Sequence, residues 1–530
     1  MDLIISNLRI PVENDGPAEY IRAASEKLKI IDSDIGLIKI LNKSLDLDSQ
    51  EQFYYRISIV VRVPDSFANA ENFPVYTVIA EPIRKAKNIK GRPVVIGFGP
   101  AGIFAALELV EYGFKPLIFE RGRKIEERDL DVQKFIRDRT LDPESNIQFG
   151  EGGAGSYSDG KLFSKINNSI YASRVLDTFI KFGAPEEIGY IGKPHVGTDV
   201  LCRIVRNMRK HIIERGGEIH YSSRMSDLLV SDGRVSGVLI NGEKEYRSAN
   251  IYLAVGHSAR DTFRMLHEKG VAIEQKAISV GVRIEHPVEI INLIRYGSKY
   301  KDFPGLGAAT YSFNYTNRST GRGVYTFCMC PGGEIVNASS ENGLMVLNGM
   351  SCSGRASAFS NAALVVRCHT DDYGSAEPLA GIDFQRNIER RAFDASGGGW
   401  KAPAQNLIDF LSGRISTELN VNSFKMGVSS ADMNGIFPKF VCEELLSAFA
   451  AWKESYPSFV SEHAILLSPE TRTSSPVRIK RDENFESVNM NNLYPIGEGA
   501  GYAGGITSSA IDAVKAVERS MSDSESIKRR

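Results

Sequence analysis

Residues 94–122 read VVIGFGPAGIFAALELVEYGFKPLIFERG, and this stretch decides the fold. The short apolar run Val94–Ile96 predicts a buried strand, and it leads directly into GFGPAG, residues 97–102. An apolar helical pattern follows, and a second apolar run, Pro116–Phe119, ends at Glu120, 18 residues after the last glycine. The order of strand, glycine turn, helix, strand and acid predicts a Rossmann-like βαβ unit with a dinucleotide at its first turn.

Each glycine of this loop has a physical role. Gly97 permits the tight turn, Gly99 lets the backbone approach a pyrophosphate, and Gly102 lets the helix pack closely on the strand. The helix that follows presents free N–H groups and its positive dipole end to the phosphates. Glu120 is placed to accept hydrogen bonds from a ribose diol. A GxGxxG loop alone also fits an ordinary tight turn, but the flanking strand, helix and acid favour the dinucleotide site.

The composition excludes several classes of protein. The chain has 530 residues, enough for two to four domains, and a net charge of −1. Such a balance leaves no basic footprint for nucleic acid as the main ligand. No apolar run approaches the roughly 20 residues that span a bilayer. The N-terminal MDLIISNLRI lacks the basic segment and long apolar region of a signal peptide. We therefore expect a cytoplasmic protein with no membrane partner.

The six cysteines are scattered, which indicates reduced thiols. Cys328-Met329-Cys330 is CxC, not the CxxC of dithiol oxidoreductases, and alternating cysteines are typical of a buried strand face. A zinc site formed by Cys328, Cys330, Cys352 and Cys368 would match no usual ligand spacing. No metal is expected.

The chain divides into three predicted parts. Residues 1–85 show a strand, helix, strand, strand order, which predicts a small α+β domain, and the basic segment 84–93 is typical of a linker. Residues 91–275 and 461–521 are expected to form one discontinuous Rossmann-like domain, with residues 276–460 inserted as an α+β substrate or cap domain. The final SDSESIKRR is expected to be disordered.

A second GxGxxG, residues 499–504, lies near the C-terminus in LYPIGEGAGYAGGITSSA. It could mark a second nucleotide domain, but only one helix follows it, with no second strand and no acid for a ribose. The better interpretation is that LYPIG returns to the first sheet. The helix starting near Ile506 then faces the same dinucleotide, and its N-terminus would stabilise negative charge on a reduced flavin. Glu498 would lie beside the ribityl chain or the pyrophosphate. A third segment, Ala254–Gly256, ends another apolar strand.

Three segments together resemble the FAD-binding elements of the flavoprotein superfamily that includes glutathione reductase. They are the loop of residues 97–102 with Glu120, the segment around Ala254–Gly256, and LYPIGEGAGYAGG near the C-terminus. That group commonly has GD at the last element, whereas this chain has Gly497-Glu498. Other strings resemble one bacterial family of FAD-dependent oxidoreductases: GEGGAGSYSDGKLFSK (150–165), GKPHVGTD (192–199), FCMCPGGEIV (327–336), NGMSCSGR (348–355) and SPETRTSSPVR (468–478).

The resemblance implies FAD as the cofactor, in an architecture with an FAD lobe and a substrate lobe. From the residues alone, FAD and NAD stay open at the first loop, and the return of the C-terminus to the same site favours FAD. The expected cofactor-binding residues are Gly97, Gly99, Pro100, Ala101, Gly102, Glu120, Arg121, Gly155, Ser156, Gly160, Lys161, Met225, Ala254, Val255, Gly256, Gly497, Glu498, Gly504, Gly505, Ile506 and Thr507.

Five residues are candidates for catalysis. His195 titrates near neutrality and suits proton transfer, although a lone histidine is more often structural or solvated. Lys161, in a glycine-rich loop, could polarise the flavin or bind an anion, or could be an exposed lysine. Arg283, Arg355 and Arg472 lie in glycine- or serine-rich contexts and suit carboxylate binding, although most arginines form structural salt bridges.

The leading hypothesis is an FAD-dependent oxidoreductase that exchanges hydride between flavin N5 and a small molecule bound between the two lobes. NAD(P)H or a partner protein could supply electrons. One alternative is an FAD-dependent reductase or monooxygenase of alkenes or aromatics, which oxygen reactivity of the reduced flavin would distinguish. Another is an RNA-associated flavoprotein that uses its N-terminal domain, against which the charge balance counts.

Overall fold

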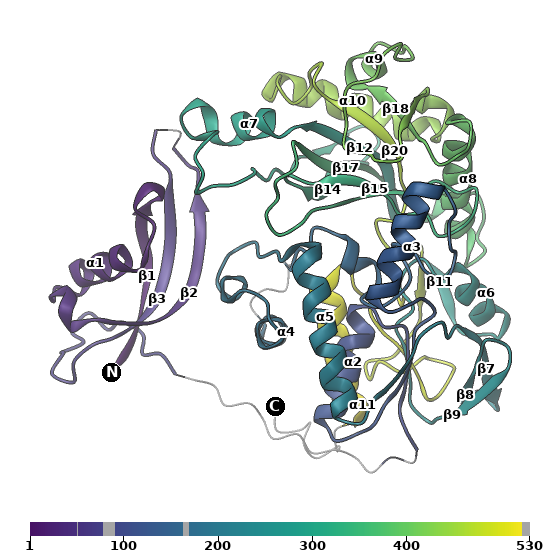
Figure 1. Ribbon diagram of the computed structural model, residues 1–530, viewed down its shortest axis with the longest axis horizontal. Coiled ribbons are helices and arrows are strands. Elements are labelled where there is room, and N and C mark those ends of the chain that lie inside the picture. The colour runs from purple at the N-terminus through teal and green to yellow at the C-terminus, as the bar shows by residue number, and fades with distance from the viewer. Residues whose placement is uncertain (50, 78–88, 90, 163–168, 522–530) are drawn as a thin grey trace.

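The computed structural model describes residues 1–49, 51–77, 89, 91–162 and 169–521. Figure 1 shows a small N-terminal sheet beside a larger body, which has one layered part below and a second sheet with its helices above. The predicted C-terminal tail and most of the predicted linker lie outside the described residues. Within the described part of the chain, no helix has the length and apolarity needed to cross a membrane.

The N-terminal part has the predicted order of elements. Its strands form an antiparallel sheet in the order β1-β3-β2, and α1 packs on one face (Figure 1). The core consists of alternate apolar residues, such as Leu3 and Ile5, that point from the sheet toward the helix. The elements are β1 (Asp2–Pro11), α1 (Pro17–Leu28), β2 (Gly36–Asp46) and β3 (Tyr54–Arg62).

The second part contains a five-stranded parallel sheet in the order β22-β10-β4-β5-β6. Its strands are β4 (Val94–Ile96), β5 (Leu117–Phe119), β6 (Glu218–His220), β10 (Ile251–Leu253) and β22 (Leu493–Pro495). The strands are short and, apart from the edge strand β6, largely apolar, as expected for a parallel sheet covered on both faces. This confirms a Rossmann-like α/β fold and the return of the C-terminus to the first sheet.

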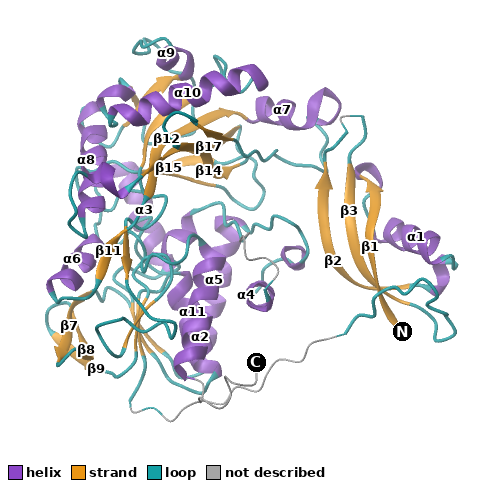
Figure 2. Cartoon of the chain, turned by 180° about the vertical axis from the view of Figure 1, so that it is seen from behind, coloured by secondary structure: helices purple, strands orange, loops and turns teal. Residues whose placement is uncertain are grey.

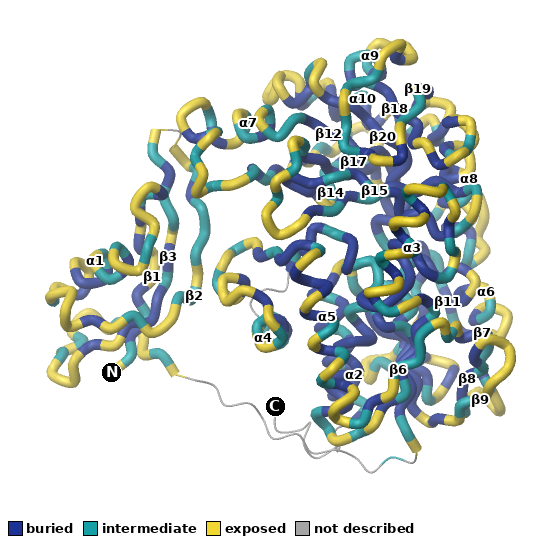
Figure 3. The backbone as a smooth tube through the Cα atoms, viewed as in Figure 1, coloured by how far each residue is buried: buried dark blue, intermediate teal, exposed yellow. Residues whose placement is uncertain are grey.

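Each face of this sheet has its own apolar core. One core joins alternate strand residues such as Val95 and Ile118 to helices α2 (Pro100–Glu111), α4 (Ile170–Lys181), α5 (Gly197–Glu214) and α11 (Ile506–Met521). The other joins Val94 and Phe119 to β7 (Met225–Ser231), β8 (Arg234–Ile240) and α6 (Arg260–Glu268). β9 (Lys244–Arg247) completes the small sheet with β7 and β8. Figure 3 shows buried backbone, in dark blue, in this layered body and also in the part that contains β12, β17 and β20.

The third part is built on a seven-stranded sheet in the order β13-β14-β17-β12-β20-β18-β19 (Figure 2). The strands are β12 (Ile278–Pro287), β13 (Asn314–Thr316), β14 (Gly323–Cys330), β17 (Phe359–Cys368), β18 (Ala402–Asn406), β19 (Val428–Ser430) and β20 (Ile465–Glu470). The pair β15 (Glu334–Asn337) and β16 (Leu347–Met350) lies beside it. The accompanying helices are α7 (Val288–Tyr300), α8 (Ala380–Ala395), α9 (Leu407–Leu411) and α10 (Lys439–Ser455).

The structure corrects the predicted boundary at residue 461. The sequence predicts that residues 461–521, which include β20, belong to the Rossmann-like domain. In the structure β20 pairs with β12 and β18 and is a buried strand of the seven-stranded sheet. The chain leaves this sheet only before β21 (Val477–Ile479), which pairs with β11 (Ile273–Gln275). We propose that the inserted domain extends from about residue 276 to about residue 473.

Candidate functional site

A large pocket opens along one edge of the parallel sheet. Gly97, Glu120, Ala254 and Ile496 directly follow β4, β5, β10 and β22, and all four line the pocket. Because the strands are parallel, their carboxyl ends meet at one edge, which is where open α/β sheets bind ligands. The pocket encloses about 1530 Å³, including its open mouth.

The glycine loop of residues 97–102 leaves no room for other side chains at two positions. Gly97 has φ +93°, and an added Cβ would lie 2.4 Å from the carbonyl oxygen of Ala254. A Cβ on Gly102 would lie 1.9 Å from the carbonyl oxygen of Gly97, so α2 can pack against the turn only with glycine there. Gly99 differs, because a Cβ there would meet Gly153 Cα at an ordinary 3.5 Å. Its open space faces the pocket beside the α2 N-terminus, as a bound pyrophosphate requires.

Glu120 is held by the backbone around it. One carboxylate oxygen accepts from Phe98 N at 2.7 Å, and the other accepts from Gly122 N and Gly150 N, each at 2.9 Å. The side chain is buried, yet it lines the pocket. These contacts tie three loops together at the sheet edge. A carboxylate oxygen can accept more than one hydrogen bond, so Glu120 retains capacity for a ribose hydroxyl.

The segment 497–507 joins the same pocket, far along the chain from the first loop. Glu498, Gly505 and Ile506 line it, and Gly505 N donates to Glu498 Oε2 at 3.3 Å. The helix α11 begins at Ile506, so its N-terminal N–H groups face this region. A Cβ on Gly499 would lie 2.5 Å from the carbonyl oxygen of Gly256, so the second glycine loop packs against the turn after β10.

The predicted cofactor residues separate into two groups. Those that line the pocket are Gly97, Gly99, Pro100, Ala101, Glu120, Arg121, Gly155, Lys161, Met225, Ala254, Val255, Gly256, Glu498, Gly505 and Ile506. Those that are not part of the lining are Gly102, Ser156, Gly160, Gly497, Gly504 and Thr507. The second group supports the first: Thr507 Oγ1 donates to the Leu162 carbonyl at 2.9 Å and fixes the start of α11 beside the 150–162 loop.

Two of the five catalytic candidates reach the pocket. Lys161 lines it, forms an ion pair with Asp159 at 2.9 Å and donates to the Met329 carbonyl of β14. Arg472 also lines it, but its guanidinium is already bound to Glu389 and to the hydroxyl of Ser340.

The other three candidates lie outside the pocket lining. His195 pairs through its backbone with Lys161, and burial together with Arg355 lowers the pKa of His195 to about 4, so its ring is neutral. Arg355 binds Asp159, with its shortest contact at 2.6 Å. Arg283 is fully buried and contacts Glu470. Arg355 and Arg283 thus bind Asp159 and Glu470, two carboxylates of the protein that line the pocket. The sequence predicted instead that these arginines would bind a carboxylate of the substrate.

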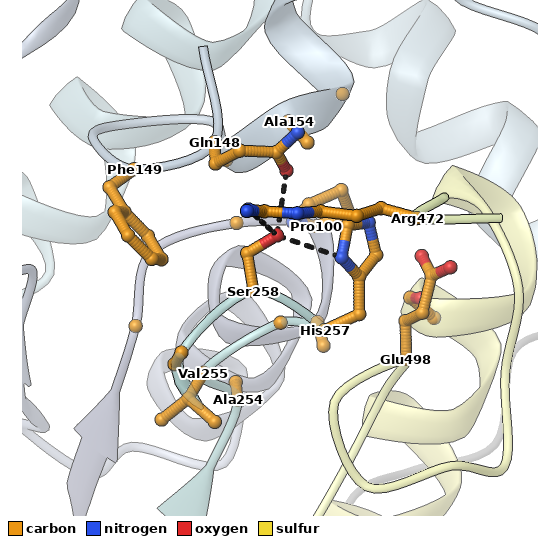
Figure 4. A pocket seen from close by; sticks show the side chains of 18 of the residues that line it. Pro100, Gln148, Phe149, Ala154, Ala254, Val255, His257, Ser258, Arg472 and Glu498 are labelled. Carbon is orange, nitrogen blue, oxygen red and sulfur yellow. Dashed lines mark hydrogen bonds between the residues drawn. The ribbon is translucent and has the colours of Figure 1, made fainter. Parts of the chain in front are cut away.

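The sequence prediction missed a polar group on the pocket wall (Figure 4). Ser258 Oγ contacts Gln148 Oε1 at 3.2 Å, His257 Nδ1 at 2.9 Å and Arg472 Nη1 at 3.1 Å. Burial and the nearby Arg472 and Arg260 lower the pKa of His257 to about 3, so the ring is neutral. One signal was present, because His257 and Ser258 directly follow the predicted Ala254–Gly256 turn.

The seven-stranded part supplies the rest of the lining through Phe327, Cys328, Cys330, Asn348, Gly349 and Glu470. Cys328 departs from the predicted buried strand face: it has φ +41° at a bulge in the β14–β17 pairing, and its side chain is exposed while Cys330 is buried. Among the described residues, no cluster of His, Cys, Asp and Glu is arranged to hold a metal ion.

Two carboxyl groups in the pocket titrate near neutrality. Burial raises the pKa of Glu498 to about 7, against the lowering effects of the Gly505 N–H and Lys276. Burial likewise raises the pKa of Glu470 to about 7, against the lowering effect of Arg283. Groups that exchange protons near pH 7 are what acid–base chemistry in a buried site requires.

The fold and this pocket define an α/β protein with a Rossmann-like sheet whose carboxyl edge opens onto a large pocket. A family model described as "FAD-dependent protein, C-terminal domain-like" matches residues 277–473. A Clostridium beijerinckii protein described as uncharacterized is 41% identical over 527 residues, which cover 98% of each chain. The chain belongs to the same family as this Clostridium beijerinckii protein, its residues 277–473 match the FAD-dependent domain, and its cofactor is FAD.

Other similarities are more distant. A thiamine thiazole synthase of Pyrococcus horikoshii is 26% identical over 156 residues, 29% of this chain and 48% of that protein. A geranylgeranyl bacteriochlorophyll reductase-like structure from Thermoplasma acidophilum is 13% identical, with TM-score 0.34, and the match covers 83% of this chain and 79% of that chain. The halogenase PltM in complex with FAD is 10% identical, with TM-score 0.36, and the match covers 80% of this chain and 67% of that chain.

Proposed function

We propose that the protein is an FAD-dependent oxidoreductase, within the superfamily that includes glutathione reductase, that acts on a small molecule. One observation carries the proposal. A single pocket is lined by the FAD-type loops of residues 97–102 and 498–506 and also by Phe327, Cys328 and Glu470 of the inserted domain. A cofactor held by the loops therefore shares its cavity with side chains from a second domain, as a reacting substrate requires.

FAD, when bound, supplies two-electron transfer through the N5 position of its ring. The chain supplies the surroundings. The N–H groups at the start of α11 and the side chain of Lys161 favour negative charge on the ring, and Glu498 offers a carboxyl group to the ribityl chain or pyrophosphate. Gly97, Gly99 and Glu120 hold the ADP half.

The electron donor enters the same pocket in this proposal. The second GxGxxG packs against the turn after β10 and belongs to the FAD site, so it is not available to bind a second dinucleotide. NAD(P)H, a protein or the substrate itself could then reduce FAD only by reaching the shared cavity. Both the reductive and the oxidative direction fit this arrangement.

The test is anaerobic reduction of the purified FAD-loaded protein. NADH, NADPH and a panel of hydroxy acids, amino acids and alcohols are added while the flavin absorbance is followed, and reoxidation by oxygen, quinones and unsaturated compounds is then measured. We expect at least one compound to bleach or restore the flavin band in a saturable way. Failure of every compound, with FAD bound and reducible by dithionite, would contradict the proposal of an enzyme of small molecules.

A further inference from the structure

Glu470 stands at the end of β20, where the seven-stranded sheet meets the pocket. It is buried at 3% exposure and still contributes to the pocket lining. A short chain of contacts connects it to the start of α11. Thr507 binds the carbonyl of Leu162, and the neighbouring Lys161 binds the carbonyl of Met329 on β14. Arg283 then joins the Cys328 carbonyl at 2.9 Å to Glu470.

The carboxyl group of Glu470 is only partly used by the protein. Its side chain has one partner among the described residues, Arg283, whose Nε donates to Oε2 at a long 3.3 Å. Arg283 is shared, because it also donates to Asn361 Oδ1 at 3.2 Å and to the Cys328 carbonyl. Glu470 Oε1 accepts no hydrogen bond within the described part of the chain, although it belongs to a residue of the pocket wall. With no partner in the protein and a place in the pocket lining, this oxygen is available to a ligand.

We propose that Glu470 is the acid–base group that exchanges a proton with the substrate while FAD exchanges two electrons with it. This rests on the proposed oxidoreductase function and narrows its substrate class to compounds with a polarised double bond or the corresponding saturated bond. In the reductive direction the π bond of the substrate breaks. One of its atoms gains hydrogen with the electron pair from reduced FAD, and the adjacent atom gains the proton of the Glu470 carboxyl. The carboxylate left behind recovers a proton from solvent.

The electrostatic surroundings suit this role. Burial raises the pKa of Glu470 to about 7, so both protonation states are populated at neutral pH. The charged and titratable groups that face it are Arg283 from β12 and Cys328 from β14. Among the described residues, Arg283 is the charge that faces Glu470; it favours the ionised carboxylate, whereas burial favours the protonated carboxyl group.

The experiment compares the FAD reduction potential of wild type and Glu470→Gln at pH 5.5 and pH 8.5, by dithionite titration with a reference dye. A carboxylate near the ring disfavours its reduction, and Gln is neutral at every pH. We expect the two proteins to agree at pH 5.5. At pH 8.5, we expect Glu470→Gln to favour reduced FAD by about tenfold, which is about 30 mV for a two-electron couple. Glu470→Asp, which keeps the charge, is expected to stay close to wild type at pH 8.5.

Glu285 provides the matched control. It lies on β12 in the same sheet, and burial raises its pKa to about 7, but its carboxylate accepts from Ser423 N at 2.8 Å and does not line the pocket. Glu285→Gln is expected to leave the potential unchanged at both pH values. Equal potentials of wild type and Glu470→Gln at pH 8.5, or an equal shift in Glu285→Gln, would overturn the proposal. A wild-type protein that binds no FAD would instead overturn the proposed function. If Glu470→Gln does not fold, Glu470→Ala replaces it in the same comparison.

Discussion

Gly97 and Ala254 touch through their backbones: a Cβ on Gly97 would lie 2.4 Å from the carbonyl oxygen of Ala254. The contact joins the turn after β4 to the turn after β10, two parallel neighbours in the sheet. Both residues line the pocket. The pocket that we propose for FAD is therefore assembled from turns that are distant in sequence and adjacent at one sheet edge.

The first prediction concerns Gly99→Val. Gly99 has φ −81°, and the nearest atom to an added Cβ is Gly153 Cα at 3.5 Å, so the protein alone tolerates a side chain there. We expect the variant to fold and to lose FAD, because the valine fills the space of the pyrophosphate. Flavin absorbance and the melting temperature of the apo-protein are the measurements. Gly323→Val, where nothing lies within 4 Å, is the control and is expected to keep FAD. A folded Gly99→Val protein with full FAD content would show that this loop does not hold the phosphates.

The second prediction concerns removal of the N-terminal domain. A chain that starts near Lys90 keeps every pocket residue, so we expect it to bind FAD. It is also expected to be less stable, since Phe53 stacks on Tyr300 at 4.4 Å between ring centroids and is fully buried. Loss of such an aromatic contact costs about 3–5 kcal/mol. Phe53→Ala in the full chain is expected to reproduce this loss of stability. A soluble truncated protein without FAD would mean that the first 85 residues complete the site.

The third prediction concerns the buried ion network of Glu389. This carboxylate binds Arg260 and Arg472 with no exposure to solvent. Burial acts to raise the pKa of Glu389, but the two arginines outweigh it and lower the pKa to about 2. Its contribution to stability is therefore full above its ordinary pKa of about 4.3 and is lost as the pH falls toward 2.

We expect Glu389→Gln to lower the free energy of unfolding by about 3–5 kcal/mol at pH 7, because it removes the buried carboxylate that Arg260 and Arg472 share and leaves only the more exposed Glu341 near them. Urea denaturation at pH 7 and pH 3 measures the effect, and the difference from wild type is expected to narrow at pH 3. Asp383→Asn, on the exposed side of the same helix, is the control. A difference that does not depend on pH would contradict the ion-network explanation.

The fourth prediction concerns Glu498 in the protein without FAD. Burial raises its pKa to about 7, so the folded state disfavours the ionised form. The penalty is absent below the ordinary pKa of about 4.3 and grows up to about pH 7. We expect Glu498→Gln to raise the melting temperature of the apo-protein at pH 8 and to leave it unchanged at pH 4.5. Stabilisation of the same size at both pH values would rule out relief of a buried charge.

The sequence predicted the parts of the fold that are local. The βαβ unit at 94–122, the N-terminal order of elements and the late return of LYPIG each depend on a short apolar run beside a diagnostic turn. The sequence did not predict that Ile465–Glu470 belongs to the inserted sheet, because strand pairing with β12 and β18 is a long-range property. An apolar run alone fits any buried strand.

The site residues also differ in whether a local sequence pattern or a long-range contact determines their role. Glycines such as Gly97 and Gly102 are set by backbone geometry and could be recognised from their spacing. The arginines could not, because whether Arg283 binds a ligand or Glu470 depends on a partner about 190 residues away in sequence. Glu470 carries no local signal, since its unused hydrogen-bonding capacity and its raised pKa arise only from burial in the folded protein.

The central claim is that one FAD is held by three separate segments, and an experimental structure of the FAD-bound protein tests it most directly. The account predicts a single FAD in contact with residues 97–120, 254–256 and 498–506, with its flavin ring at the start of α11. The decisive measurement is the distance from the backbone nitrogens of Gly505 and Ile506 to the nearest flavin oxygen, which is expected to be about 3 Å. A flavin ring far from these nitrogens, or a second nucleotide bound at residues 499–504, would contradict the account.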